Sequence, residues 1–395
     1  MVDAKLKSVS EVDLRARRAA TPVREFILKV AARCNLSCTY CYEYHHGDES
    51  WRLASKFMSP EVCDAAASRI AEHIRAHELK EVTVALHGGE PLLLGPKRLA
   101  KIAETLQDRI SATGAELVIT MQTNCILMSE DVADVVQKYN INVGVSIDGD
   151  KDGNDLNRID HRGRGSYERV LRGINMLRDR VPGEPNGILA VIDIRNDPLK
   201  TFDAIANLQV RNIDFLLPHH NWDRLPPRDA LASVAAYGDW LSVVWDAWIG
   251  GRHKEHRIRF FDNIVARLVG HPGLYESMTE SPVALITINT DGDIEGVDTL
   301  KSTGSGVQRT GLSILHCEVD AVLTHELYLA RQDWQLALPS ACEGCSINRI
   351  CTGGYMPHRY RAATGFDNPS VYCEDIKHVV SRIEKTIVGL TASVS

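Results

Sequence analysis

The sequence predicts an α/β protein built around a parallel sheet, because strand and helix signals alternate through its first half. Six apolar, β-branched runs have the length of buried strands: residues 26–31, 82–86, 117–121, 143–147, 188–194 and 213–217. Helical periodicity fills the intervals between them, at residues 59–76, 99–111, 129–139, 166–177 and 198–208. Ser59 and Ser129 are expected N-caps of two of these helices. A parallel crossover needs a covering helix, so the alternation favours a parallel sheet.

Composition and charge fit an enzyme that acts on neither nucleic acid nor membranes. The chain has 395 residues, of which 44% are apolar and 25% charged, so it can bury a large core, and we expect two domains. Its net charge is −7 without a Lys/Arg block, which gives no electrostatic case for a nucleic acid or an anionic membrane. No apolar segment resembles a signal or a span, so we expect a cytoplasmic protein. In a reducing compartment its ten cysteines favour metal ligation over disulfides.

Three cysteines cluster directly after the first expected strand. Cys34, Cys38 and Cys41 have the spacing C-x3-C-x2-C. Three thiols can hold three irons of a cubane cluster, which leaves the fourth iron free to chelate a small molecule. A zinc knuckle or a set of buried apolar thiols is the alternative interpretation. Zinc normally needs a further cysteine pair or a histidine at similar spacing, and only His45 and His46 follow closely.

This loop resembles that of the radical S-adenosylmethionine (radical SAM) superfamily, C-x3-C-x-aromatic-C, with Tyr40 at the aromatic position. The resemblance implies that the three cysteines hold a [4Fe-4S] cluster whose open iron binds SAM. It also implies cleavage of SAM to a 5′-deoxyadenosyl radical, with an electron donor such as flavodoxin or ferredoxin. Six strand–helix units fall short of the eight of a closed barrel. By this resemblance residues 25–225 form a partial (β/α)6 barrel.

Further motifs follow the expected strands at their C-terminal ends. Gly88, Gly89 and Glu90 end the second strand and resemble the family's GGEP segment, whose backbone carbonyls contact the SAM amino group. Glycine suits this task because a ligand against the main chain leaves no room for a Cβ. On the residues alone, a Gly-Gly pair is equally a turn. Ser146 and Arg158 resemble positions that bind the SAM ribose or carboxylate, and ordinary turn chemistry is their alternative.

The polar segments after the third, fourth and sixth strands would share one rim with these motifs. They comprise residues 122–124, 146–149 and 218–222. In barrel enzymes that rim carries the active site. His219, His220 and Trp222 are therefore candidates to line a substrate cavity, although histidines in loops are commonly just solvated.

The pattern changes after residue 225, where two successive prolines interrupt the alternation. Residues 1–24 are an expected N-terminal arm, and residues 226–280 an expected helical bridge with helices near 234–248 and 259–269. Short strand signals at 285–293 around Asp291-Gly292 predict a hairpin. Four later thiols can close a metal site: Cys342, Cys345, Cys351 and Cys373.

Residues 281–395 resemble the SPASM domain of radical SAM enzymes that modify peptides, here with a C-terminal helix. A full SPASM domain holds two auxiliary [4Fe-4S] clusters, and the four late cysteines match the ligands of the second. The first cluster's positions carry Val297, the neighbourhood of Cys317, and Tyr355. We therefore expect one auxiliary cluster, with a structural zinc as the alternative at the four thiols. Cys63 and Cys125 are expected to be buried free thiols.

Residues 351–360 and 365–373, together with residues 86–91, resemble FxsB-type maturases of ribosomally made peptides. This resemblance implies a precursor-peptide substrate and a carbon–carbon crosslink, a three-residue cyclophane from an aromatic ring carbon to a Cβ. The alternatives are a sulfatase-maturating, formylglycine-forming dehydrogenase, which normally keeps the first auxiliary cluster, and another peptide oxidation or epimerisation. A non-catalytic metal-binding or peptide-carrier protein is a further alternative, and it would leave the SAM loop without a role.

Asp298 is the candidate catalytic base. It follows Val297, and related sulfatase-maturating enzymes place a catalytic Asp just after the matching cysteine. A carboxylate there could take the proton that leaves the aromatic ring when the crosslink forms. The alternative is an Asp that caps a turn near Asp291 and Asp293.

Overall fold

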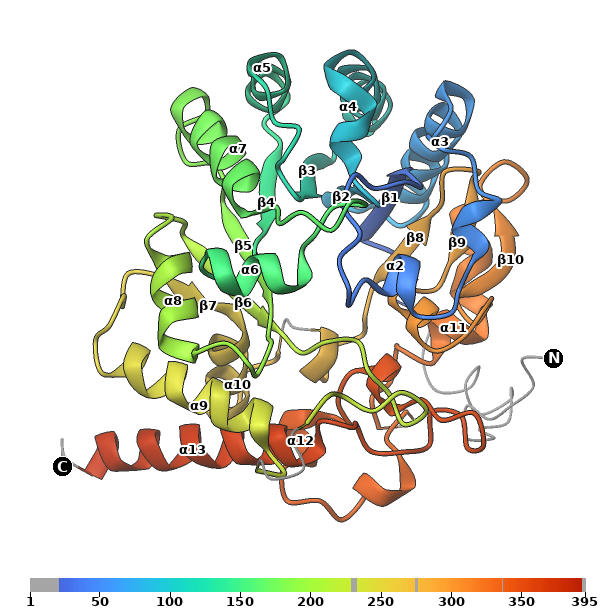
Figure 1. The fold of residues 1–395 in the computed structure, drawn as a ribbon. Helices are drawn as coiled ribbons and strands as arrows, with labels where there is room; N and C mark the ends of the chain where they lie inside the picture. Colours follow the sequence, from blue (N-terminus) through green and yellow to red (C-terminus); the bar gives the residue numbers. More distant parts are fainter. Residues whose placement is uncertain (1–20, 229–232, 274–275, 336, 393–395) are drawn as a thin grey trace.

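The computed structural model describes residues 21–228, 233–273, 276–335 and 337–392 (Figure 1). Six parallel strands form the centre of one sheet, and each pairs with the next along the chain: β1 (Glu25–Ala31), β2 (Glu81–Gly88), β3 (Glu116–Thr123), β4 (Asn142–Ser146), β5 (Gly187–Val191) and β6 (Asn212–Leu216). The predicted strands lie within three residues of these bounds. The α/β class with an open parallel sheet is confirmed.

Helices cover the outer face of this sheet, as the crossover rule requires (Figure 1). They are α3 (Pro60–Ala76), α4 (Gly95–Ser111), α5 (Glu130–Lys138), α7 (Tyr167–Arg180) and α8 (Pro198–Ala206). Ser59 and Ser129 cap α3 and α5 as predicted, since each hydroxyl accepts a hydrogen bond from the backbone N–H three residues on. A short helix that the sequence did not suggest, α6 (Lys151–Asn157), follows β4.

The predicted hairpin is present, but it belongs to the barrel sheet. Strand β8 (Leu285–Ile288) pairs in parallel with β1, and β9 (Asp293–Glu295) and β10 (Arg309–Ser313) continue the sheet in antiparallel fashion. At the opposite edge β7 (Arg257–Ile258) pairs with β6. Without β8, strand β1 would expose a row of unpaired backbone groups. This pairing also brings the segment that follows β9 close to the cysteine loop that follows β1.

Three helices support the C-terminal half. The bridge contains α9 (Ala236–Ile249) and α10 (Arg259–Leu268), and the chain ends in α13 (Cys373–Ala392). Trp245 of α9 donates its indole N–H to Thr386 of α13 at 3.2 Å, and both helices run along one side of the molecule (Figure 1). Among the helices that the structure describes, none is both long and apolar enough to cross a membrane.

Six short helical turns lie within the described part of residues 296–372. They are η4 (Asp298–Ser302), η5 (Val319–Thr324), α11 (Glu326–Leu329), η6 (Ser340–Cys342), α12 (Asn348–Cys351) and η7 (Met356–Arg359). Other short turns occur at η1 (Ser50–Arg52), η2 (Pro91–Leu94), η3 (Glu276–Met278) and α2 (Tyr42–His45). Cys63 and Cys125 are buried, as expected.

Candidate functional site

The three-cysteine loop leaves the C-terminal end of β1 and is held there by the segment after β2. The backbone N–H of Gly89 donates to the carbonyl of Ala31 at 2.8 Å, and that of Glu90 donates to the carbonyl of Arg33 at 3.0 Å. Cys34, Cys38 and Cys41 are free thiols that are partly exposed. Helix α2 begins directly after Cys41. The loop is thus fixed at both ends.

The two glycines of this segment are required by packing of the protein itself. A Cβ on Gly88, whose φ is +137°, would lie 2.1 Å from the Ala31 carbonyl oxygen. A Cβ on Gly89 would lie 2.0 Å from the Tyr44 hydroxyl and 2.3 Å from the Arg33 carbonyl oxygen. Neither carbonyl can withdraw, because both belong to backbone next to the cysteines. Close approach of main chain to main chain therefore accounts for Gly88 and Gly89, beside the ligand contact that the sequence suggested.

Glu90 joins the ends of two strands beneath the loop. It is buried, and it accepts hydrogen bonds from the Thr123 hydroxyl at 2.6 Å and from the Asn124 backbone N–H at 2.8 Å. The Asn124 amide in turn donates to the Asn35 side chain at 2.7 Å. Burial raises the pKa of Glu90. This carboxyl group therefore positions the loop from below.

Tyr40 and Arg158 form a second buried support. The Tyr40 hydroxyl donates to Asp148 at 2.5 Å, and the Arg158 guanidinium donates to the Tyr40 oxygen at 2.8 Å. Burial raises the pKa of Cys38, and the neighbouring charge of Arg158 opposes that rise. Ser146, at the end of β4, accepts a hydrogen bond from the Gln122 amide at 2.8 Å. Ser146 thus lies at a strand end as expected, whereas Arg158 lies at the C-terminal end of α6.

The spread of the three thiols fits a cluster better than a single ion. Within the described residues, no three thiols have their sulfur atoms all within 4.8 Å of one another. Tetrahedral zinc with bonds of about 2.3 Å needs sulfurs about 3.8 Å apart, whereas the ligands of a cubane stand farther apart. Burial, with Cys38 and Glu43, raises the pKa of Cys41 to about 12. A metal must therefore displace the proton from this thiol.

The four late cysteines converge in the same manner. They line one pocket together with Pro369 and Ser370: Cys342, Cys345, Cys351 and Cys373. Burial and the three other cysteines raise the pKa of Cys351 to about 12. Here too, no three of the four sulfur atoms all lie within 4.8 Å of one another. These donors therefore fit a second cubane better than a zinc ion.

Packed side chains occupy the positions where a further cluster would need thiols. Val297 lies in a small apolar core with Leu300, Leu327 and Phe366. The Tyr355 hydroxyl is hydrogen-bonded to Thr299 at 2.6 Å, and the Cys317 thiol donates to the Ser313 carbonyl at 3.0 Å. Of these three described positions, the one at Cys317 carries a thiol, and Val297 and Tyr355 are held by packing and a hydrogen bond instead.

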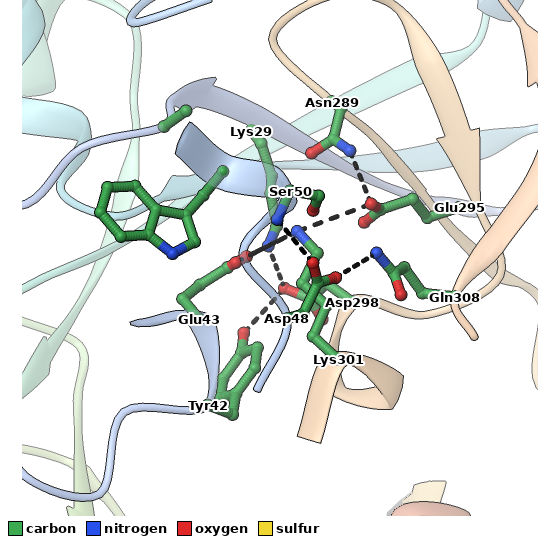
Figure 2. A network of polar contacts seen from close by, with 12 residues as sticks. Lys29, Tyr42, Glu43, Asp48, Ser50, Asn289, Glu295, Asp298, Lys301 and Gln308 are labelled. Atoms are coloured by element: carbon green, nitrogen blue, oxygen red, sulfur yellow. Dashed lines mark hydrogen bonds and ion pairs between the residues drawn. The ribbon is translucent and has the colours of Figure 1, made fainter. Parts of the chain in front are cut away.

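Asp298 lies in a buried ionic network that joins β1, α2 and η4 (Figure 2). Its Oδ2 accepts a hydrogen bond from the Tyr42 hydroxyl at 2.7 Å and lies 3.0 Å from the Lys29 ammonium. Lys29 also donates to both carboxylate oxygens of Glu43. Because Tyr42 directly follows Cys41, the network places a carboxylate one side chain away from the cysteine loop.

Lys301 completes this network from the other side. Its ammonium lies 2.8 Å from a carboxylate oxygen of Glu43 and 3.5 Å from one of Glu295. The ammonium groups of Lys29 and Lys301 thus face three buried carboxylates, those of Glu43, Glu295 and Asp298. Burial alone would raise the pKa of Asp298, but Lys29, helped by His87 and the Tyr42 hydrogen bond, holds it below its usual value. Because its pKa is lowered, Asp298 is ionised. The pKa of Glu295, in contrast, is raised by burial.

Sequence reasoning missed Lys29, Tyr42, Glu43 and Lys301. The available signal was Lys29, a charged residue in the middle of an otherwise apolar strand, which a buried parallel sheet admits only when the charge is paired. Glu43 is 14 residues from Lys29 along the chain, and Asp298 is 269 residues from it. Lys301 is 258 residues from its partner Glu43, so no local sequence pattern connects these residues.

Of the candidate cavity residues, His219 lies beside Tyr42. The two rings meet edge to face with centroids 5.0 Å apart, and His219 also contacts Tyr355 and His358. Burial lowers the pKa of His219 to about 4. Trp222 instead donates its indole N–H to the Pro369 carbonyl at 2.7 Å, and His220 lies against His46. His219 is thus the one of the three that touches the Asp298 network.

Comparison with known protein families places the cysteine loop and the strands around it in one family model. The family model described as the radical SAM superfamily matches residues 28–207, which contain the three-cysteine loop, most of β1, and β2–β5. The chain is an enzyme with a [4Fe-4S] cluster and SAM as cofactors, as the sequence predicted. An auxiliary cluster fits its relatives as well as its late cysteines.

Two sulfatase-maturating enzymes are similar to this protein over nearly the whole chain. A serine-type anaerobic sulfatase-maturating enzyme of Bacteroides thetaiotaomicron is 25% identical over 90% of this chain and 88% of its own. A cysteine-type anaerobic sulfatase-maturating enzyme of Clostridium perfringens is 29% identical over 90% of this chain and 95% of its own. The solved structure of anSMEcpe with bound AdoMet and the Cp18Cys peptide has a TM-score of 0.78 at 19% identity and covers 94% of this chain and 99% of that one. The last likeness establishes the fold.

Proposed function

We propose that this enzyme is a maturase that oxidises a side chain of a peptide or protein, by dehydrogenation at the Cβ of a serine or cysteine. The observation that carries the proposal is the ionised carboxylate of Asp298, hydrogen-bonded to Tyr42 beside the cysteine loop. Relatives named as serine-type and cysteine-type sulfatase-maturating enzymes, which align over 90% of this chain, support the same class of substrate.

The reaction removes two electrons and two protons from the substrate, and the described residues divide this work. When bound, SAM and its cluster supply a carbon radical that takes a hydrogen atom from the Cβ. We assign Cys34, Cys38 and Cys41 to that cluster. Tyr40, Gly88, Gly89, Glu90, Ser146 and Arg158 would position the loop and SAM. Asp298 would accept the remaining proton, from a hydroxyl or thiol on the same carbon.

The remaining electron needs an acceptor, and the four late cysteines can hold one. We assign Cys342, Cys345, Cys351 and Cys373 to a single auxiliary [4Fe-4S] cluster, for which their shared pocket is support. An external one-electron donor such as flavodoxin or ferredoxin would start each cycle. Iron–sulfur chemistry and ten unpaired cysteines fit a reducing cytoplasm.

Formation of a cyclophane is the second candidate. It is favoured by the apolar core around Val297, which leaves one auxiliary cluster where the sulfatase-maturating enzymes normally have two. Crosslinking also removes one hydrogen atom, one proton and one electron, so the same residues would serve. The substrate would then be a ribosomally made precursor peptide with an aromatic residue two positions before the attacked Cβ.

One experiment separates the two reactions. Reconstituted enzyme is incubated anaerobically with SAM, a reductant and either a serine- or cysteine-containing sulfatase-type peptide or a peptide with an aromatic residue at the crosslinking spacing. Loss of two hydrogens from the serine peptide, with a product that reacts with hydrazide, supports dehydrogenation. Loss of two hydrogens without an aldehyde, and with resistance to sequencing between the linked residues, supports the cyclophane. Formation of 5′-deoxyadenosine without change in either peptide would contradict both.

A further inference from the structure

Two histidines and an aspartate form a compact cluster on α3, away from both cysteine sets. His73 and His77 are four residues apart on α3 and its C-cap, so they share one helix face, and Asp320 of η5 lies against both. One nitrogen of each ring and one carboxylate oxygen all lie within 4.8 Å of one another. This is the compactness that the cysteine sets lack and that a single ion requires.

The hydrogen bonds of His73 leave one ring nitrogen in need of a cation. Its Nε2 lies 3.1 Å from the Val23 carbonyl oxygen, which can only accept, so Nε2 carries the hydrogen. In a neutral imidazole Nδ1 then carries a lone pair, and this lone pair faces Oδ1 of Asp320. Two acceptors in contact repel each other. A second proton, or a metal ion bound to both atoms, would remove this repulsion.

Burial favours the metal ion over the second proton. The His73 side chain is 1% exposed, so an imidazolium there would lose nearly all of its hydration and would have the Asp320 carboxylate as its compensation. A neutral imidazole is also the form that binds metal, and the carbonyl on its other nitrogen is the usual outer partner of a metal-bound histidine. His77 and Asp320 are 25% and 37% exposed, so an ion and its water can enter from solvent.

We propose that His73, His77 and Asp320 bind one divalent transition-metal ion, with zinc as the best match. Two histidines one helical turn apart and a carboxylate are a common zinc donor set, with a water in the fourth position. The ligands would be Nδ1 of His73, Nε2 of His77 and a carboxylate oxygen of Asp320. The ion would tie the end of α3 to η5, and so the barrel to the segment that follows β10.

The test measures metal on the reconstituted holoenzyme, not activity. The protein is equilibrated with zinc, passed over a weak chelating resin, and analysed for zinc and iron, and the zinc ligands are read from X-ray absorption at the zinc edge. We expect one zinc per chain bound by nitrogen and oxygen. His77→Ala, at the exposed end of the cluster, and Asp320→Asn should each weaken zinc binding about tenfold or more. Iron content and SAM cleavage should stay at the wild-type level.

His271→Ala is the matched control, because this histidine is exposed and lies outside the cluster. It should keep the full amount of zinc. Sulfur ligands at the zinc edge would mean that zinc occupies a cysteine set, and this would overturn the proposal. So would an equal zinc content in His77→Ala and wild type, or no retained zinc at all. The last result would show that the cluster is a histidine–carboxylate hydrogen bond only.

Discussion

Replacement of Asp298 by asparagine tests the proposed proton acceptor with the least disturbance of the structure. Asparagine keeps the size of the side chain and an oxygen that can still accept the Tyr42 hydrogen bond. It removes the negative charge 3.0 Å from Lys29. Lys29 keeps Glu43, whose second carboxylate oxygen lies 2.8 Å from the ammonium. Both lysines of the network therefore keep a carboxylate partner.

The charge balance of the network predicts that this variant folds. Removing one member of a buried ion pair usually costs about 3–5 kcal/mol, because the other member stays buried and unpaired. Here two cations face three carboxylates, so the substitution leaves two of each. We expect a loss of about 1–3 kcal/mol, the scale of one charged hydrogen bond. Urea denaturation of the variant checks this value.

Catalysis should suffer far more than stability. General-base help contributes about 10²–10⁴-fold, so product formation should fall at least about 10²-fold. Both clusters should assemble, and 5′-deoxyadenosine should still form when peptide is present. The assay quantifies 5′-deoxyadenosine and oxidised peptide in the same anaerobic reaction, and the expected result is a large rise in their ratio.

Glu295→Gln is the matched control for this prediction. It removes the same charge from the same network, yet Glu295 contacts Lys301 at 3.5 Å and Asn289, whereas Tyr42 donates its hydrogen bond to Asp298. We expect product formation near the wild-type rate. Equal losses in both variants would show that only the total charge of the network matters. A wild-type rate in Asp298→Asn would refute the reasoning and make Asp298 a structural turn residue.

Four further outcomes are expected. Reconstituted protein should hold about eight irons, and replacing Cys34, Cys38 and Cys41 with alanine should halve this number and abolish SAM cleavage; about twelve irons would contradict the apolar core at Val297. Cys342→Ser with Cys345→Ser should keep SAM cleavage and lose oxidised peptide, and full oxidation by a soluble variant that lacks the second cluster would exclude the electron-acceptor role. Gly89→Ala should lose the first cluster, since its Cβ would meet the Arg33 carbonyl at 2.3 Å, while Gly389→Ala, with open space around it, should not. The pKa of His219 is lowered to about 4, so the unfolded chain binds more protons between that value and about 6.5; the free energy of unfolding should fall as pH drops through this window, less steeply in His219→Gln.

The sequence could predict what depends on local pattern. The six central strands carry continuous apolar runs, and the helices between them carry capping serines, so their bounds followed from periodicity. The thiol sets were also local, because spacing alone brings Cys34, Cys38 and Cys41 into one loop. Pairing of β8 with β1 was not predictable in this way. It joins segments 260 residues apart, and the short run Leu285–Ile288 has no signal that specifies its neighbour.

The ionic network shows the same limit at the level of side chains. Asp298 was identified by its position after Val297, but its chemical state depends on Lys29, which the fold brings from the far end of the chain. A buried lysine in a strand indicates that some carboxylate must lie nearby. It does not indicate which of the chain's acidic residues that is. Only the sheet order, which places η4 next to β1, decides between them.

The lowered pKa of Asp298 also fixes when this residue can act. An ionised carboxylate stabilised by Lys29 is a weak base, so it cannot take a proton from an ordinary serine hydroxyl or cysteine thiol. Once the Cβ has lost a hydrogen atom, the proton on the adjacent oxygen or sulfur is more acidic, and it becomes strongly acidic when the electron of the carbon radical also leaves, because the product is then a neutral aldehyde or thioaldehyde. Proton transfer to Asp298 would become favourable only together with that electron transfer. In the proposed reaction the network would therefore order the steps: hydrogen abstraction would come first and the proton would follow, and loss of Asp298 should separate the two steps without slowing the first.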